Sequence, residues 1–142
     1  DWKSWNAETA HKNKASYGYH EWLWSSKKDK EFRAKHTSSP AAVAIKDIQT
    51  GTAGVVSEFF VTDANGGNVV QTQITSDWFQ GDEAKFKEPA SGSAIFADKP
   101  KRDETTGETG VHVSVPVFEA GPDGKKQLIG VAVVLVVIDK IK

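Results

Sequence analysis

Apolar residues recur at helical spacing over the stretch that begins at Ser39-Pro40 and ends near Gly51. Serine offers a side-chain cap for a helix N-terminus, and proline fits the first helical turn, so this pair predicts where the helix starts. The apolar residues lie three and four positions apart, which predicts one buried face. The members of this stripe are Ala41, Ala44, Ile45 and Ile48.

The chain further upstream also has a helical pattern. Ser26 and Asp29 have the spacing of a capping box, with Asp in place of Glu or Gln, and this predicts a helix up to Lys35. Before them, four tryptophans stand among polar residues with Gly18 interrupting, and we predict one long or broken helix there. Residues 1–50 therefore form a predicted N-terminal helical region.

Beyond residue 50 the pattern changes to the alternation that is typical of strands. Val55–Thr62 and Asn68–Ile74 are predicted strands joined by a tight hairpin, because Asn65-Gly66 supplies the positive φ angles that such a turn needs. The segment 75–86 is a predicted turn or short helix that ends before Pro89. Three later strands are predicted at Ser93–Ala97, Val111–Glu119 and Leu128–Ile138.

The order of these elements predicts an α+β architecture in a single domain over residues 1–142. The last two strands are close in sequence and should pair antiparallel, and the valine-rich run Leu128–Ile138 predicts a buried central strand. In Val111–Glu119, four valines alternate with a mixed face that carries His112 and Ser114. We expect the N-terminal helices on the valine face and a ligand pocket on the mixed face.

Composition narrows the classes of function. The chain has 142 residues, a hydrophobic fraction of 38% and a formal net charge of -1, which argues against a broad nucleic-acid surface. The sequence contains no cysteine, which excludes disulfides and thiolate zinc sites, and no methionine, so we expect a segment to have been removed before residue 1. No apolar run approaches the roughly 20 residues of a membrane span, so any anchor is expected outside these residues.

Motifs for catalysis or metal binding are missing from the sequence. Its four histidines lack zinc-site spacing, and neither a GxSxG elbow nor a phosphate-binding GxxxxGK[ST] loop is present. The oxygen-rich run Asp63–Asn68 has some features of a calcium loop, but a hairpin turn is favoured because the terminal Glu is missing. We therefore predict no catalytic residues, no metal and no cofactor.

The run EFFVTDANGGNVVQTQITSDWFQGDEAKF (Glu58–Phe86) resembles the PAS-like periplasmic sensor domains called PDC or Cache domains, in their single-Cache form. Its block TSDWFQGDEAKF (Thr75–Phe86) is similar to the pattern TSDYWQGDEAKW of that family. KDKEFRAK (Lys28–Lys35) resembles the end of the family's N-terminal helix, and Val113–Ile141 resembles its closing hairpin. The resemblance implies a five- to six-stranded antiparallel sheet in residues 51–142, with a long N-terminal helix on one face and a ligand pocket on the other.

The resemblance also implies a function. Domains of this kind lie in the periplasm or another extracytoplasmic space, bind a small polar metabolite such as an organic acid or an amino acid, and signal by a ligand-shifted conformation without catalysis. The implied partner is the metabolite. The residues themselves predict no nucleic-acid partner and membrane contact only through segments outside this chain. For the N-terminal tryptophans we expect either a buried helix stripe or a homodimer contact along the N-terminal helix. The alternative is a structural or protein-interaction module whose pocket is closed by side chains.

Six candidate ligand-binding residues lie in the segment 75–88, which is placed to roof the pocket. The aromatic ones offer apolar contact, although packing in a helix core is an equal alternative. The polar ones could fix a polar ligand, whereas acidic residues there could instead cap a helix start. The six are Trp78, Phe79, Gln80, Asp82, Lys85 and Phe86.

Three further candidates lie outside that segment. His112 and Ser114 turn away from the valine face, and the alternative is a hydrogen-bonded structural role for the histidine. Arg102 belongs to the loop Asp98–Gly110 and could bind a carboxylate in bidentate fashion. Because the loop's basic and acidic residues alternate, a solvated loop is the alternative.

Overall fold

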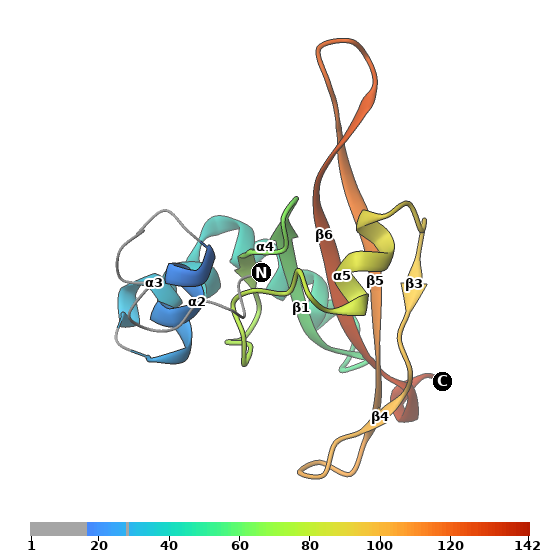
Figure 1. The fold of residues 1–142 in the computed structure, drawn as a ribbon. Coiled ribbons are helices and arrows are strands. Elements are labelled where there is room, and N and C mark those ends of the chain that lie inside the picture. The colour runs from blue at the N-terminus through green and yellow to red at the C-terminus, as the bar shows by residue number, and fades with distance from the viewer. Residues whose placement is uncertain (1–16, 28) are drawn as a thin grey trace.

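The structure, a computed structural model, describes residues 17–27 and 29–142, so the predictions for residues 1–16 lie outside the described residues. Its helices are α2 (Tyr17–Ser25), α3 (Lys30–Ser38), α4 (Pro40–Gly51) and α5 (Ala84–Ala90), with a 3-10 turn at Ile138–Lys140. Its strands are β1 (Val56–Asp63), β2 (Asn68–Gln71), β3 (Phe96–Ala97), β4 (Lys101–Arg102), β5 (Thr109–Ala120) and β6 (Lys126–Val137). Figure 1 shows α2 and α3 grouped at one end of the sheet and α4 behind β1.

The strands form one six-stranded antiparallel sheet in the order β2-β1-β6-β5-β3, with β4 also paired to β5. The valine-rich β6 lies between β1 and β5, which confirms the prediction of a buried central strand. The hairpin of β5 and β6 provides the longest pairing, from Gly110 opposite Val137 to Ala120 opposite Lys126. The predicted α+β fold with its antiparallel sheet is confirmed.

The described N-terminal region consists of three helices, as the residue pattern predicts, and not of the one long helix that the resemblance implies. Lys27 has a φ of 57°, in the left-handed region, which ends α2 before α3 begins. Asp29, and not Ser26, caps α3, because its carboxylate accepts the backbone N–H of Phe32 at 2.8 Å. The α3 helix therefore begins and ends three or more residues later than the sequence pattern predicts.

The α4 helix starts where the sequence predicts, but it buries a different face. Ser39 Oγ accepts the backbone N–H of Ala42, which confirms the predicted cap. The buried residues are Ala42 and Ile45, whereas Ile48 of the predicted stripe is 59% exposed. The predicted stripe was therefore wrong except for Ile45, because alanine fits a buried or an exposed position equally well.

Each face of the sheet has its own cluster of buried side chains. On the front face Phe60, Val131 and Val133 pack against Phe86 of α5. On the back face Val70 packs against Ala42 and Ile45 of α4, with Phe59 and Val61 beside them. The front cluster supports the groove described below.

The sequence predicts that the N-terminal helices cover the valine face of β5, which lies at the back of the sheet. They do not cover it. The α4 helix packs against β1 and β2 instead, since it leads directly into β1 through a short turn at residues 52–55. The valine face of β5 is consequently only partly buried, and Val115 is 38% exposed.

Between β1 and α5 the chain departs from the predicted elements. The Asn65-Gly66 hairpin turn is confirmed, with a φ of 95° at Gly66. However, β2 ends at Gln71 and not at the predicted Ile74. The segment predicted as a turn or short helix is irregular up to residue 83, and the short helix α5 begins only at Ala84. The α5 helix includes Pro89 near its C-terminal end, where the prediction placed the proline outside.

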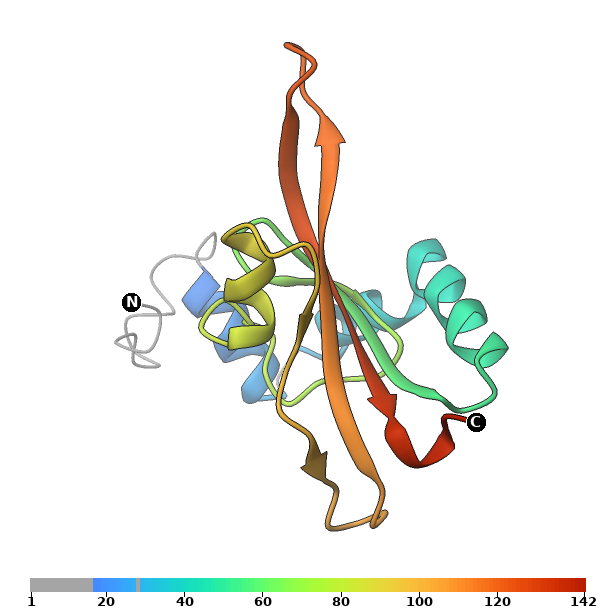
Figure 2. The same ribbon diagram turned by 90° about the vertical axis from the view of Figure 1, so that its right-hand side faces the viewer.

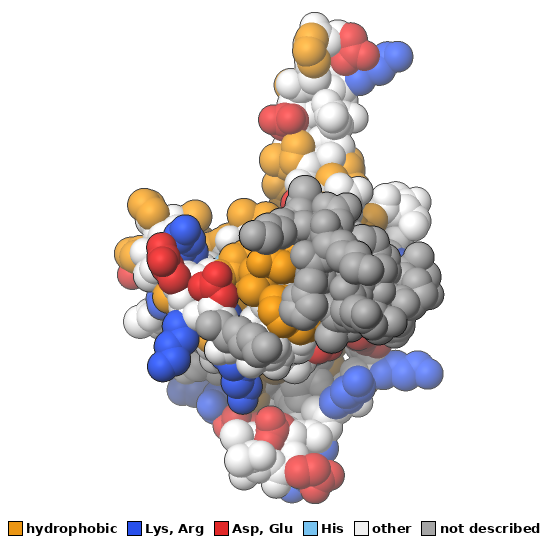
Figure 3. All heavy atoms as spheres, turned by 60° about the vertical axis from the view of Figure 1, so that its left-hand side comes forward, with side chains coloured by type: hydrophobic (Ala, Val, Ile, Leu, Met, Phe, Trp, Pro, Cys, Tyr) orange, Lys and Arg blue, Asp and Glu red, His pale blue; other side chains and the backbone are white. Residues whose placement is uncertain are grey.

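The far end of the β5–β6 hairpin projects beyond the rest of the sheet (Figures 1 and 2). In the space-filling view it stands clear of the body, with apolar and charged side chains side by side (Figure 3). Phe118 and Ile129 on this projection are 46% and 41% exposed. Among the described helices, none is both long and apolar enough to cross a membrane.

Candidate functional site

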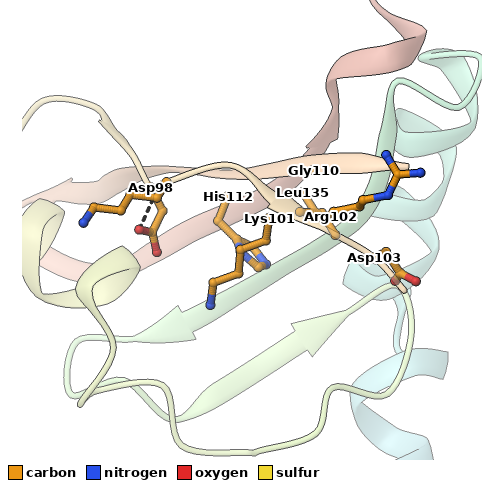
Figure 4. Close-up of a pocket in the computed structure, with 8 residues that line it drawn as sticks. Asp98, Lys101, Arg102, Asp103, Gly110, His112 and Leu135 are labelled. Carbon is orange, nitrogen blue, oxygen red and sulfur yellow. Dashed lines mark hydrogen bonds between the residues drawn. The ribbon is translucent and has the colours of Figure 1, made fainter. Parts of the chain in front are cut away.

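Two adjoining hollows lie on the front face of the sheet, and His112 and Leu135 line both of them. Their volumes are about 210 Å³ and about 200 Å³. Together they form what we call the groove. Its first hollow is lined by Asp98, Lys99, Lys101, Arg102, Asp103, Gly110, His112 and Leu135 (Figure 4). Its second hollow is lined by Glu58, Phe60, Thr75, Ser76, Asp77, Gln80, Glu83, Lys85, His112 and Leu135.

The second hollow is the acidic half of the groove. Glu58, Asp77 and Glu83 supply carboxylates from β1, from the turn after β2 and from the start of α5. Glu58 Oε1 lies 3.6 Å from His112 Nε2, so the two strands β1 and β5 place an acid and an imidazole together across β6. Lys85 adds one ammonium group, whose Nζ lies 5.6 Å from the centre of the Phe60 ring. Carboxylates therefore outnumber the fixed positive charges in this half.

The first hollow is the basic half. Lys99, Lys101 and Arg102 line it from β4 and the residues before it, with Asp98 and Asp103 at either side. The Lys101 side chain projects from β4 in the same part of the close-up as His112, whereas the Arg102 guanidinium extends away from His112 (Figure 4). The Arg102 guanidinium lies beside the β4–β5 turn. A Cβ added at Gly107 in that turn would be 3.5 Å from Arg102 Nη2.

Residues 75–81, which we call the roof segment, border the acidic half. A buried hydrogen-bond network holds its start: Thr75 Oγ1 donates to Gln71 Oε1 at 3.0 Å, and Asn68 Nδ2 donates to Thr75 Oγ1 at 3.0 Å. Gln80 Nε2 donates to the carbonyl of Asp77 at 2.9 Å, which closes the segment into a turn. These bonds bring Asp77 and Gln80 to the groove without any regular secondary structure.

The aromatic candidates lie away from the groove lining. Trp78 is 6% exposed and packs among rings from α2 and α3, with its centroid 4.9 Å from that of His20 and 6.3 Å from that of Phe32. Phe79 contacts the ring of Tyr17, with centroids 5.9 Å apart. Phe86 belongs to the front core. Trp78 and Phe86 therefore pack in the protein core, which was the alternative to a ligand-binding role.

Of the nine predicted site residues, the structure brings Gln80, Lys85, Arg102 and His112 together around the groove. Ser114 is 1% exposed on β5 and does not line either hollow. Asp82 follows the roof segment and is also absent from both linings.

The groove also contains residues that the sequence analysis did not select. Glu58 is the clearest example of such a residue. Strand alternation could have indicated it, because Glu58 is two positions from Phe60 and therefore lies on the same face of β1. Glu83 occupies the N-cap position of α5, makes no side-chain capping bond and lines the acidic half of the groove. Among the described residues, no group of three or more His, Cys, Asp or Glu is arranged to hold a metal ion.

This antiparallel sheet, with α2 and α3 at one end, α4 behind it and a polar groove on its front face, has the fold of PDC/Cache-type sensor domains. The structure is similar to the ligand-binding domain of the Pseudomonas aeruginosa PAO1 amino acid chemoreceptor PctC in complex with GABA, with a TM-score of 0.55 and 21% identity over 71% of this chain and 44% of that one. No family model and no curated protein matches the sequence.

Two other solved structures match with lower TM-scores. The ligand-binding domain of the Pseudomonas fluorescens chemoreceptor CtaA, in complex with L-leucine, has a TM-score of 0.49 and 21% identity over 77% of this chain and 47% of that one. The sensor domain of the V. cholerae histidine kinase DctB has a TM-score of 0.46 and 20% identity over 86% and 48%. The chain thus spans about half the length of the domains that it matches.

Proposed function

We propose that this chain is an extracytoplasmic sensor domain whose groove binds a small polar metabolite, an organic acid or an amino-acid-like molecule, and performs no catalysis. The observation that carries the proposal is the groove itself, in which a basic half and an acidic half meet at His112 and Leu135. A concave site with apolar walls and a few convergent polar groups is the usual form of a small-molecule site.

The charges in the groove suit a ligand that carries a carboxylate. Lys101 offers an ammonium donor on the side of His112, and Arg102 offers a guanidinium donor at the end of the hollow beside the β4–β5 turn. Bonds of this kind are stronger than those between neutral groups. An amino group on the same ligand would find carboxylate partners in Glu58 and Asp77. Gln80 and Lys85 border the same half and complete the proposed set of contacts.

The fold supports the sensing role. The PctC domain was solved with GABA bound, and it shares its fold with this chain. In such a domain a ligand acts by favouring one of two conformations, to the extent that it binds one better than the other. The alternative function, an interaction module with a closed pocket, predicts a filled interior, whereas both hollows here are open to ligand-sized groups.

A thermal-shift screen of amino acids, dicarboxylates and diamines, followed by calorimetric titration of the hits, tests this function. We expect amino acids or carboxylates to raise the melting temperature and diamines not to do so. Because a charge-assisted bond contributes about 1.5–3 kcal/mol, Arg102→Ala or Lys101→Ala should weaken binding by about 10- to 100-fold. Lys87→Ala is the matched control, since Lys87 is exposed on α5 and does not line the groove.

The proposed function fails if no amino acid or carboxylate at millimolar concentration shifts the melting temperature. It also fails if the hits bind equally well to the Arg102, Lys101 and Lys87 variants, because the ligand would then bind outside the groove.

We also propose a homodimer formed through the N-terminal helical region. The outer flank of α4 exposes Ala41, Ala44 and Ile48, which lie at helical spacing and offer an apolar stripe to a second copy. In sedimentation velocity we expect the wild type to dimerise and Ile48→Glu to be monomeric. Val69→Glu is the control, because Val69 is 56% exposed on β2. A wild type that stays monomeric, or an equal loss in both variants, contradicts this contact.

A further inference from the structure

The side of the roof segment that faces away from the groove is held by the N-terminal helices. Glu21 of α2 is 7% exposed, and its Oε2 accepts the backbone N–H groups of both Trp78 and Phe79 at 2.8 Å. A single carboxylate oxygen thus satisfies two consecutive amides of the roof segment. Bonds of backbone N–H groups to a carboxylate are charge-assisted when the acid is ionised.

The side chain of Trp78 makes a second attachment, to α3. Its Nε1–H donates to His36 Nε2 at 3.2 Å, and the other ring nitrogen, Nδ1, lies 2.7 Å from the carbonyl oxygen of Phe32. An indole N–H is a donor only, so His36 Nε2 is the acceptor and Nδ1 carries the proton that is donated to Phe32. The contacts therefore define one neutral tautomer of His36, which is 9% exposed.

A third attachment joins the roof segment to the β1–β2 turn. The backbone N–H of Asn68 donates to the carbonyl of Trp78 at 3.0 Å, and that of Gln80 donates to the carbonyl of Gly66 at 2.7 Å. Glycine is required for this approach, because a Cβ at Gly67 would lie 2.5 Å from the Trp78 indole. The roof segment is thus a short strip that is hydrogen-bonded to the helices and to the β1–β2 turn, with the groove on its other side.

Neighbouring residues of the roof segment contact opposite sides: some line the groove, and others bind the N-terminal helices. Asp77 and Gln80 line the groove, whereas the amides of Trp78 and Phe79 between them are held by Glu21. Trp78 and Phe79 are the two residues between Asp77 and Gln80, so a displacement of their amides acts on the backbone of both groove residues.

We propose that Glu21 is a positioning residue of the groove: by accepting two consecutive amides of the roof segment, it fixes Asp77 and Gln80 and ties their position to α2. This role rests on the proposed binding function of the groove. It gives a ligand that contacts Asp77 or Gln80 a direct mechanical link to the N-terminal helices.

The surroundings of Glu21 make this attachment sensitive to protonation. Burial raises the pKa of Glu21 to about 7, and the nearby carboxylates of Asp77 and Asp82 add to that rise, while the two amide bonds oppose it. The other titratable groups of this cluster include His20 and Tyr17 of α2, His36 of α3 and Asp63 of β1. Burial together with His36 lowers the pKa of His20, while Asp63 opposes that shift. The two amide bonds should therefore strengthen as the pH rises and the carboxyl loses its proton.

A ligand-free NMR titration of the full 142-residue chain tests the proposal. The backbone amides of Trp78 and Phe79 report the attachment, and the side-chain amide of Gln80 reports the groove. We expect both sets of resonances to shift with one common midpoint in the wild type. Glu21→Gln keeps an oxygen acceptor and so preserves the fold, but it has no proton to lose, and we expect the common midpoint to disappear from both sets.

The control is Glu31→Gln, which removes an exposed carboxylate from the neighbouring helix α3 and should leave the common midpoint in place. The proposal is overturned if the amides of Trp78 and Phe79 titrate while Gln80 does not. It is equally overturned if the common midpoint is missing from the wild type or persists in Glu21→Gln. Since no ligand is used, a failure here is distinct from a failure of the binding screen.

Discussion

Replacing Phe60 with alanine should lower the free energy of unfolding by about 3–5 kcal/mol, the usual cost of removing a buried aromatic ring. Phe60 is 1% exposed and packs with Phe86, Val131 and Val133 in the front core. It also forms the floor of the acidic half of the groove. This cost has two parts: the lost free energy of transferring the ring from water into the core, and the cavity left beneath α5. The cavity persists because the paired strands cannot move to fill it.

Chemical denaturation measures this loss directly. Ile95→Ala is the control, because Ile95 is 65% exposed and its truncation should change stability by no more than about 0.5 kcal/mol. A cost below about 1 kcal/mol for Phe60→Ala would contradict the close packing of Phe60 in the front core.

Gly130→Ala should be comparably damaging for a steric reason. Gly130 lies on the central strand β6, opposite Asp63 of β1 and Val117 of β5. A Cβ at this position would overlap the backbone carbonyl oxygen of Thr62. Since backbone atoms in a paired strand cannot move aside as a flexible side chain does, we expect a loss of about 3 kcal/mol or more, at the upper end of overpacking effects.

Gly51→Ala is the matched control for this substitution. Gly51 ends α4, has no positive φ, and has open space where a Cβ would lie. Alanine there should stabilise the protein by about 0.5–1 kcal/mol, because it loses less backbone entropy in a helix. The melting temperatures of the two variants should therefore shift in opposite directions from that of the wild type. A Gly130→Ala protein as stable as the wild type would contradict the β1–β6 register.

The sequence predicted those elements that short local motifs determine, such as a helix cap, a tight turn or a run of β-branched residues. The Ser39-Pro40 pair starts α4, and the Asn65-Gly66 turn joins β1 to β2. The β-branched run of β6 is the central strand because it is apolar on both faces. Each of these outcomes follows from backbone preferences and hydrophobicity that act within a few residues.

Where tertiary packing decides, the sequence was less informative. The direction of Trp78 depends on Glu21 and His36, which are more than 40 positions away in the chain. Ser114 obeys the predicted alternation, but the short α5 helix packs against β5, and Ser114 is buried. Glu58 could be assigned to the groove only once the register of β1 with β6 placed it beside His112.

The most direct test of the central claim is chemical-shift mapping of the tightest ligand from the screen on the isotope-labelled protein. We expect the largest changes at Gln80, Lys101 and His112, which line the groove from the roof segment, β4 and β5. Changes confined to the back of the sheet or to the β5–β6 projection, with these three residues unmoved, would show that recognition occurs elsewhere.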